Sequence, residues 1–507
     1  MSPLSSAEKK CILQDVCNVE FYPLISDNIH FSPVLLSKTV MSSSSSSAME
    51  MEIFQYIDAH QSDFIKEWVA VESNSVQPHL RNEVMQMMAL AAERLATLGA
   101  TVNLANNLVI SGLPDGQVLP LPSVILGELG KDPQNPTACF YGHVDVQPAK
   151  KEDGWNTDPY TLTEIDGNLY GRGATDNKGP VLAWINEVET FRALKLVVNF
   201  KFVIEGMEEA GSLELEKLLD EENQGFFSDV DYIVISDNLW LSNKKPALTY
   251  GSRGNACFFV EVECGSKDLH SGTFGGITHE PLLDSLVDST GPIQIPGIYD
   301  SVAALTEKER KLYESIEFDL EEHRNNCGVK NFLYGRNTPT PVALLLSIHG
   351  IEGAFHEPGI KTVIPAKVIG KFSIRQVPHM DLLVVKEQVR DKSFLWPLLF
   401  VFSKRNSPNK LEVSMPLGAK PWLADANNPL YKAARRAIKT VFVEDPDFIY
   451  DGSAIPVARM LQTVAQRSVM MLPTGAADDR EHSQNEKISR HNYIEGTKLF
   501  AAFFLEI

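Results

Sequence analysis

Histidine and carboxylate side chains follow apolar, β-prone runs at several separate places in this chain. They are His143 and Asp145, Asp176, Glu208 and Glu209, Asp237, and His482 near the C-terminal end. Each has an ordinary explanation when taken alone, because a single His-x-Asp or Glu-Glu is usually a solvated loop. The pair Glu208–Glu209 needs a further explanation if it is buried, since adjacent carboxylates repel each other and are costly to bury in ionised form.

Taken as a set, these residues supply two imidazoles and several carboxylates from separate strand ends. Oxygen and imidazole nitrogen ligands of this kind hold divalent ions such as zinc and manganese. In open α/β sheets, ligand sites form beyond the carboxyl ends of the strands. The sequence therefore predicts a two-metal site at such an edge, where cations allow several acids to share one cleft.

The elements that must position these residues alternate between helices and strands. Apolar residues at helical spacing predict helices over 51–71 and 81–99. Strand-like runs follow at 137–146, 197–209 and 231–238, with a helical stretch at 179–194 between the first two. Nearly continuous apolar strands that alternate with helices predict an α/β fold with a largely parallel, helix-covered sheet.

The length of the chain and the changes in its residue pattern predict more than one domain. At 507 residues the chain exceeds a single ordinary core. Residues 1–50 end in a serine run that cannot form a packed core, and we expect a disordered extension there. We assign 51–247 and 403–507 to a catalytic domain, and 248–402, with its alternating strands and turns, to an inserted α+β domain.

Composition excludes several classes of protein. The net charge of −20 argues against a nucleic-acid binder. The most apolar run, 394–402, is too short to span a membrane and contains Pro397. The six cysteines form no CxxC pair and no regular spacing, so we expect reduced thiols and a cytoplasmic location.

Seven short segments resemble one family in their order and context. They are YGHVDVQP, YGRGATDNKGP, IEGMEEAGS, ISDN, DLHSG, KFSIRQVP and HSQNE. From about residue 51 to the C-terminal end, the chain is similar to the co-catalytic metallopeptidases that include carnosinase and the cytosolic non-specific dipeptidase, relatives of aminoacylase and glutamate carboxypeptidases. The resemblance implies hydrolysis of dipeptides with a free C-terminal carboxylate. It also implies two zinc or manganese ions per subunit and a homodimer whose inserted domain acts as lid and dimerisation domain.

The resemblance carries metal-binding roles to five positions of this sequence. His143 and Asp237 would bind one ion, and Glu209 and His482 would bind the other. Asp176 would bridge the two ions.

Catalytic roles are carried over in the same way. Asp145 would orient His143, and Glu208 would be the general base that removes a proton from a water polarised by both ions. His270 in DLHSG would reach the active site of the partner subunit and stabilise the oxyanion there.

Three further residues would contact the substrate. The resemblance assigns Arg375 and Thr362 to the substrate's carboxylate and nearby polar groups, and an arginine fork suits a carboxylate. Ser453, in the segment before Ile-Pro, would contribute a hydroxyl.

Several positions depart from the family pattern around the substrate. Leu417 stands where a histidine is usual, Ala454 displaces a serine, and Arg480 and Glu481 replace a small pair before His482. The apolar run 394–402 replaces an amphipathic helix. The open alternatives are an N-acyl amino acid hydrolase, a carboxypeptidase of longer peptides, and a metal-binding pseudoenzyme with weakened activity.

Overall fold

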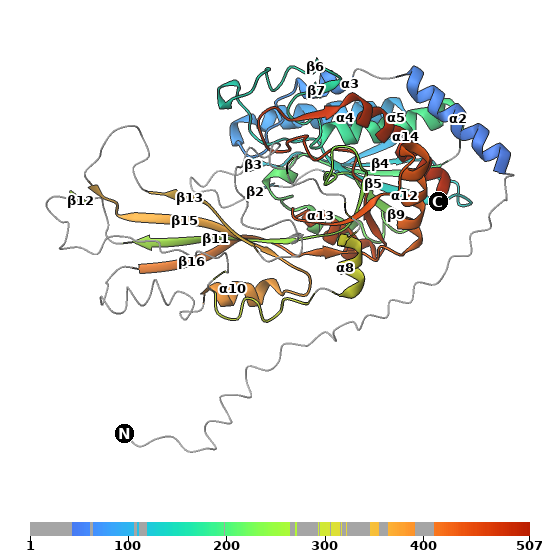
Figure 1. Ribbon diagram of the computed structural model, residues 1–507. Helices are drawn as coiled ribbons and strands as arrows, with labels where there is room; N and C mark the ends of the chain where they lie inside the picture. Colours follow the sequence, from blue (N-terminus) through green and yellow to red (C-terminus); the bar gives the residue numbers. More distant parts are fainter. Residues whose placement is uncertain are drawn as a thin grey trace. The chain divides into compact units, whose positions relative to one another are not determined.

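The structure is a computed structural model that describes a large part of the chain (Figure 1). The described residues are 43–60, 64–105, 109–110, 119–196, 198–263, 269–270, 293, 295–304, 306–314, 316, 321, 345–353, 363–390 and 410–507. The chain divides into two compact units, Met1–Ala48 and Met49–Ile507. The second unit contains every predicted site residue.

The first helix differs from the prediction. Helix α2 covers Ser43–Ala59 and so includes the last serines of the run that we expected to be disordered. Serine costs only a fraction of a kcal/mol in a helix, so the run can extend the helix that the following residues favour. The single helix predicted over 51–71 is described as two, α2 and α3 (Phe64–Val69).

The main sheet has nine strands in the order β1-β4-β8-β5-β9-β19-β10-β17, with β18 paired to β10. Their bounds are β1 Thr101–Ala105, β4 Val124–Leu129, β5 Thr137–His143, β8 Asn199–Glu205, β9 Tyr232–Ile235, β10 Ala247–Ser252, β17 Trp422–Leu423, β18 Asp447–Asp451 and β19 Val469–Met471. The strands from β8 to β19 are parallel, whereas β1, β4 and β17 pair in antiparallel fashion. The predicted α/β class is confirmed, with a mixed sheet whose parallel part is central.

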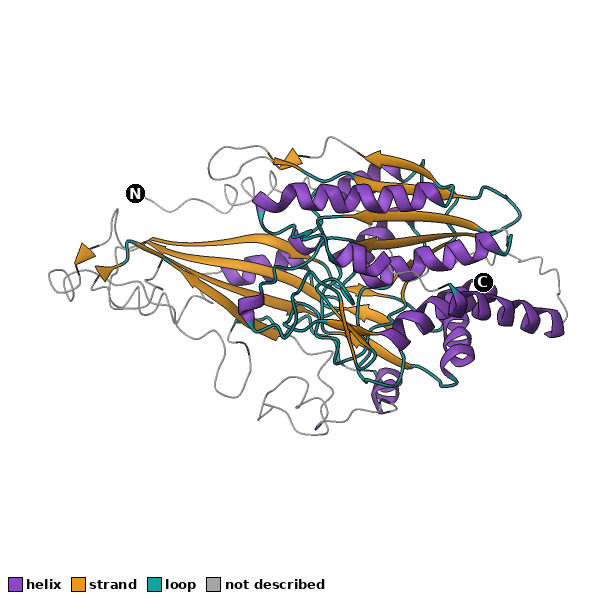
Figure 2. Ribbon diagram, turned by 90° about the horizontal axis from the view of Figure 1, so that it is seen from above, coloured by secondary structure: helices purple, strands orange, loops and turns teal. Residues whose placement is uncertain are grey.

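Helices cover both faces of this sheet (Figure 2). Along β5, Phe140 joins one hydrophobic cluster while Cys139 and Tyr141 join another, as expected when successive side chains point to opposite faces. The cluster on the Phe140 face includes residues of α4 Arg81–Thr97, α5 Lys178–Ala193, α12 Pro429–Phe442 and α14 Arg490–Glu506. The other cluster includes residues of α6 Leu215–Glu222 and α13 Pro456–Ala465. Burial on both faces explains why the central strands read as continuous apolar runs.

A second sheet has four antiparallel strands in the order β13-β15-β11-β16. Its strands are β11 Gly254–Glu263, β13 Leu345–Glu352, β15 Lys367–Gln376 and β16 Lys410–Ala419. Buried residues of helix α10 Leu382–Arg390 form one hydrophobic cluster with residues of β11 and β15. The chain enters it from β10 and returns to the main sheet at β17. The sheet does not follow the predicted limits of the insert, because β10 lies in the main sheet and β16 lies in the second sheet.

The remaining elements are short. They are β2 Val109–Ile110 and β3 Leu119–Pro120; β6 Thr163–Ile165, β7 Asn168–Tyr170 and β20 Lys487–Ser489; β12 Leu269–His270 and β14 Val363–Ile364; α8 Glu307–Glu314; and the 3-10 turns η1 Pro78–Leu80, η2 Lys151–Asp153 and η3 Glu208–Ala210. Among the described residues, no helix is both long and apolar enough to cross a membrane.

Candidate metal centre

The predicted site residues gather at the carboxyl ends of the central parallel strands. His143 is the last residue of β5, and Asp237 follows β9 by two residues. Turn η3, which carries Glu208 and Glu209, follows β8, and α5 begins just after Asp176. Because β5 lies between β8 and β9, these chain segments meet at one edge of the sheet.

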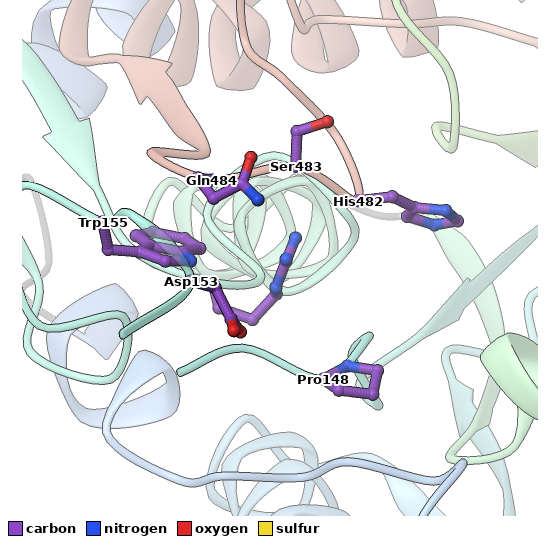
Figure 3. A pocket seen from close by; sticks show the side chains of 7 residues that line it. Pro148, Asp153, Trp155, His482, Ser483 and Gln484 are labelled. Carbon is purple, nitrogen blue, oxygen red and sulfur yellow. The ribbon is translucent and has the colours of Figure 1, made fainter. Parts of the chain in front are cut away.

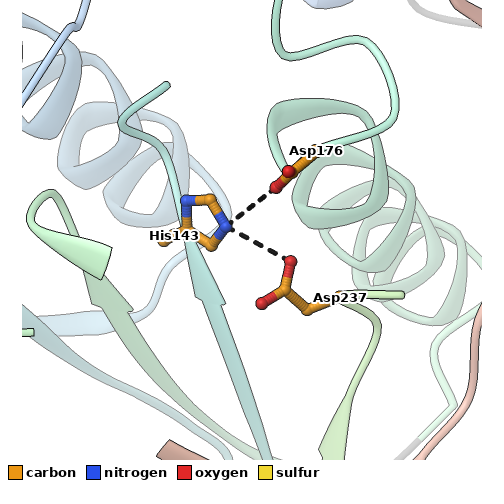
Figure 4. A group of neighbouring side chains, drawn as sticks. All are labelled: His143, Asp176 and Asp237. Atoms are coloured by element: carbon orange, nitrogen blue, oxygen red, sulfur yellow. Dashed lines mark hydrogen bonds and ion pairs between the residues drawn. The ribbon is translucent and has the colours of Figure 1, made fainter. Parts of the chain in front are cut away.

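One group of side chains forms around the buried ring of His143 (Figure 4). Its Nε2 atom lies 3.1 Å from Oδ1 of Asp176 and 3.2 Å from Oδ1 of Asp237. Its Nδ1 atom faces Asp145, 3.4 Å from Oδ1 and 3.2 Å from the backbone oxygen. Asp145 therefore holds the ring from behind, which leaves Nε2 directed at the two other carboxylates.

A second group forms around His482 and shares Asp176 with the first. The Nε2 atom of His482 lies 2.9 Å from Oδ2 of Asp176 and 3.1 Å from Oε2 of Glu209. The side-chain amide of Gln147 donates to the same Glu209 oxygen at 2.8 Å. His482 has a φ of 57°, a left-handed conformation that is uncommon for residues other than glycine.

Both groups fit a divalent ion. In each, three ligand atoms of imidazole and carboxylate type lie within 4.8 Å of one another, and Asp176 offers one oxygen to each group. Burial opposes the charging of His143, yet Asp237, Asp145 and Asp176 together raise its pKa well above the usual value. Despite the same opposition, Asp176 and Glu209 raise the pKa of His482 to about 12. The surrounding carboxylates thus favour positive charge at both points, which a divalent ion supplies.

Three carboxyls of the centre, those of Glu208, Glu209 and Asp237, are unfavourable in their charged form, whereas at Asp176 the two histidines outweigh burial and hold the pKa below the usual aspartate value. Burial raises the pKa of Glu209 and of Asp237, and it raises that of Glu208 well above the ordinary glutamate value of 4.5. A carboxyl with a raised pKa can hold a proton near neutral pH, as a general base that later acts as an acid must.

These shifts predict how the metal-free protein responds to pH. The two histidines, Glu208, Glu209 and Asp237 bind their protons more tightly in the folded protein than in the unfolded chain, so the free energy of unfolding falls as pH rises above about 5. Asp176 has a lowered pKa, and the stability it contributes is lost only below its usual pKa of 3.8. After removal of metal by a chelator, the midpoint of thermal unfolding should fall by several degrees between about pH 5 and about pH 8. Saturating zinc or manganese should flatten this dependence, and parallel curves with and without metal would contradict the assignment.

Asp145 has a contact that its spacing from His143 does not reveal. Its carboxylate accepts hydrogen bonds from the backbone N–H of Glu208 at 3.2 Å and of Glu209 at 3.0 Å. One buried carboxylate therefore ties the ring of His143 to turn η3. Backbone donors carry no sequence signal, so the residue types do not predict this link.

Glu486 fixes the loop that presents Asp176, a role not among those predicted from the sequence. Its carboxylate accepts from Nη1 of Arg172 at 2.7 Å and from the backbone N–H of Gly173, Thr175 and Asp176 at 3.0, 3.1 and 3.1 Å. The signal was present, because Glu486 is the last residue of the HSQNE segment.

A cavity of about 210 Å³ adjoins the second group (Figure 3). It is lined by Pro148, Asp153, Trp155, Arg172, His482, Ser483 and Gln484. The side chain of His482 is 54% exposed, whereas that of His143 is 1% exposed. The centre is therefore open on the His482 side and closed on the His143 side.

The predicted substrate residues are described unevenly. Arg375 lies in β15 opposite Asn255 of β11, and its charge adds to burial in lowering the pKa of Arg253. The backbone N–H of Ser453 donates to Asp451 at 2.8 Å, and its hydroxyl is buried with no partner in the part of the chain that the structure describes. The guanidinium of Arg253 lies beside Gly452 in the turn after β18.

Other predictions fall partly or wholly outside the described residues. Thr362 and the run 394–402 are outside, and the structure describes the backbone of His270 in β12 but not its side chain. Two of the departures from the family pattern can be placed. A Cβ atom on Gly211 would lie 3.3 Å from Cδ1 of Leu417, so this leucine lies over the loop after turn η3. Burial and the charge of Asp176 raise the pKa of Glu481 well above its usual value.

Two histidines that share one carboxylate at the carboxyl ends of parallel strands form a site typical of metal-dependent hydrolases. Comparison with known proteins leads to the same class. Residues 139–506 match Peptidase family M20/M25/M40. The chain is 62% identical over 473 residues to the Beta-Ala-His dipeptidase of Rattus norvegicus, covering 90% of this chain and 95% of that protein. It is 42% identical over 469 residues to the Cys-Gly metallodipeptidase DUG1 of Saccharomyces cerevisiae, covering 89% and 96%.

The fold comparison leads to the same family. The crystal structure of human carnosine dipeptidase 1 is similar with a TM-score of 0.83 and 58% identity, covering 90% of this chain and 98% of that one. The chain therefore belongs to Peptidase family M20/M25/M40 and is a metallopeptidase. The resemblance inferred from the seven motifs and the use of divalent metal are confirmed.

Proposed function

We propose that this protein is a dipeptidase that hydrolyses dipeptides with a free C-terminal carboxylate. The observation that carries the proposal is the position of Asp176, whose two oxygens each face a different histidine. This arrangement suits two ions side by side, as in hydrolases that act on peptide bonds. The names of the relatives, a Beta-Ala-His dipeptidase and a Cys-Gly metallodipeptidase, support dipeptides as the substrate class.

The proposed ions are two divalent metals, zinc or manganese, in each subunit. His143 and Asp237 would hold one ion, Glu209 and His482 the other, and Asp176 both. Bound in this way, the ions would polarise the scissile carbonyl and lower the pKa of water. Imidazole ligands favour zinc, while a site rich in carboxylates also accepts manganese.

The chain's own residues would move the proton and orient the substrate. Glu208 would take a proton from the attacking water and deliver it to the departing amine, a role that its raised pKa supports. Asp145 would keep the ring of His143 and the backbone of Glu208 in place through the contacts described above. Arg375, Thr362 and Ser453 would contact the substrate, with the guanidinium of Arg375 on the carboxylate.

A substrate panel tests this function directly. Purified protein loaded with Mn²⁺ or Zn²⁺ is assayed on β-Ala-His, Cys-Gly, other dipeptides, tripeptides and N-acetyl amino acids. We expect dipeptides to have the highest kcat/KM. Preferred cleavage of N-acetyl amino acids would reject the dipeptidase in favour of an acylase. No cleavage of any substrate by metal-loaded protein would favour a pseudoenzyme.

We also propose a homodimer in which His270 completes the site of the partner subunit. A mixture of His270→Ala and Glu208→Gln chains tests this, because each heterodimer would contain one site with both residues intact. Separately, each variant should be nearly inactive, and isolated heterodimers should recover about half of the wild-type activity. No recovery in verified heterodimers would show that His270 acts within its own subunit, and a His270→Ala chain with wild-type activity would show that it has no role.

The cytoplasmic location remains a prediction that rests on cysteine usage. The two cysteines that the structure describes, Cys139 and Cys257, are both free thiols. Free thiols are the expected state in a reducing compartment.

A further inference from the structure

Glu205 is a buried carboxylate beside the centre that the proposed reaction does not use. It is the last residue of β8, is 2% exposed, and lies opposite His143 in the parallel ladder. One of its oxygens, Oε1, accepts hydrogen bonds from the hydroxyl of Tyr141 at 2.6 Å and from the hydroxyl of Ser212 at 2.8 Å. Buried hydroxyl–carboxylate bonds of this length are strong and set the geometry of the groups they join.

Ser212 ends the loop that carries Glu208 and Glu209. Its backbone N–H donates to the oxygen of Met207 at 2.8 Å, and that of Gly211 donates to the oxygen of Glu208 at 2.7 Å. The loop is therefore a closed, hydrogen-bonded unit. Its end returns to the strand from which it left, and the hydroxyl of Ser212 fastens it there to Glu205.

Ser212 has an uncommon backbone conformation at the point of this attachment. Its φ is 48°, in the left-handed region that residues other than glycine seldom adopt. Such conformations persist where the surrounding structure holds them, and they cluster at functional sites. The bond to Glu205 supplies a local contact that holds Ser212 in place.

The loop is thus held from two sides by carboxylates. At the beginning of the loop, Asp145 accepts hydrogen bonds from the backbone N–H groups of Glu208 and Glu209. At its end, Glu205 accepts a hydrogen bond from the hydroxyl of Ser212. We propose that Glu205, acting through Ser212, is a positioning residue that sets the placement of the general base Glu208 and the metal ligand Glu209. The inference rests on the proposed function for the roles of those two residues, and on the hydrogen bonds alone for the attachment.

Two substitutions, each of which removes one hydrogen bond to Oε1 of Glu205, test whether Ser212 positions the loop or whether any loss at this buried carboxylate has the same effect. Ser212→Ala removes the hydrogen bond that fastens the loop to Glu205, while Tyr141→Phe removes a hydrogen bond to the same oxygen and leaves the bond of Ser212 intact. A small misplacement of reacting groups costs rate rather than affinity, so Ser212→Ala should lower kcat by about 10- to 100-fold with KM within about twofold. Tyr141→Phe should lower kcat by less than about threefold.

Glu205→Gln serves as the conservative variant. Burial raises the pKa of Glu205 to about 7, and a glutamine oxygen accepts the same two hydroxyls whatever the charge of the native group. Glu205→Gln should keep kcat within about threefold of wild type, whereas Glu205→Ala should resemble Ser212→Ala.

A spectroscopic measurement makes the test independent of activity. Protein reconstituted with Co²⁺ reports the geometry of its ligands through its visible absorption. Ser212→Ala should shift this spectrum, and Tyr141→Phe should leave it unchanged, with equal thermal midpoints for the two metal-free variants. Equal losses of kcat in the two variants, or a wild-type kcat and spectrum in Ser212→Ala, would overturn the proposal. If wild-type protein cleaves no dipeptide, the proposed function fails, and the Co²⁺ spectra still decide whether Ser212 positions Glu209.

Discussion

Glu208→Gln should abolish dipeptide hydrolysis, with kcat lower by about 1000-fold or more, while metal content remains at the wild-type level. The amide has nearly the shape of the carboxyl but can neither take a proton from water nor deliver one to the leaving amine. Burial gives this residue its raised pKa, and no role as a metal ligand is assigned to it. The loss should therefore be one of proton transfer alone.

The measurement combines steady-state kinetics on a preferred dipeptide with metal analysis of the purified protein. Glu216→Gln is a matched control, because Glu216 is an exposed glutamate on the nearby helix α6 and should behave as wild type. If Glu208→Gln kept more than about a tenth of wild-type kcat, another group would have to be the base.

Asp176→Asn should have the second large effect, the loss of both ions. Each carboxylate oxygen of Asp176 faces one histidine, so a single substitution removes a charged ligand from both groups. Changing a residue that merely supports a ligand costs 10- to 100-fold in metal affinity, and we expect more than about 100-fold here, at each ion. Activity should disappear with the metal.

The metal binding of Asp176→Asn is compared with that of two variants that each change a ligand of one group only. Asp237→Asn should weaken only the ion beside His143, and Glu209→Gln only the ion beside His482. Binding of Zn²⁺ or Co²⁺ is measured by competition with a chelating indicator, and thermal unfolding shows whether each variant is folded. An Asp176→Asn protein that bound as much metal as either single-group variant would contradict the bridging role.

The sequence predicted the members of the centre better than the contacts that hold them. His143, Glu209 and Asp237 lie together because they end or follow strands whose parallel order brings their carboxyl ends to one edge. Asp176 and His482 join them from the segment before α5 and from the segment between β19 and β20. The α/β class could be predicted for the same reason, since strands buried on both faces read as apolar runs.

The supporting contacts could not be predicted, because they depend on backbone groups and loop geometry. Glu486 and Asp145 bind backbone N–H groups, which every residue but proline has. Glu205 reaches Ser212 only because a closed loop returns the chain to the end of β8. The second sheet also differs in extent from the insert predicted over 248–402, because β10 pairs with β17, β18 and β19 in the main sheet and β16 pairs with β11 in the second sheet.

The unequal exposure of the two histidines has a kinetic consequence. The ring of His143 is enclosed, while the ring of His482 stands beside an open cavity. In the proposed two-ion centre, an ion at His482 would exchange with the surrounding solution more readily than an ion at the enclosed His143. Metal should therefore leave the His482 position before the His143 position when free metal is withdrawn. The occupancy of the outer position would follow the supply of free metal around the protein, while the inner ion would be retained from the time of assembly.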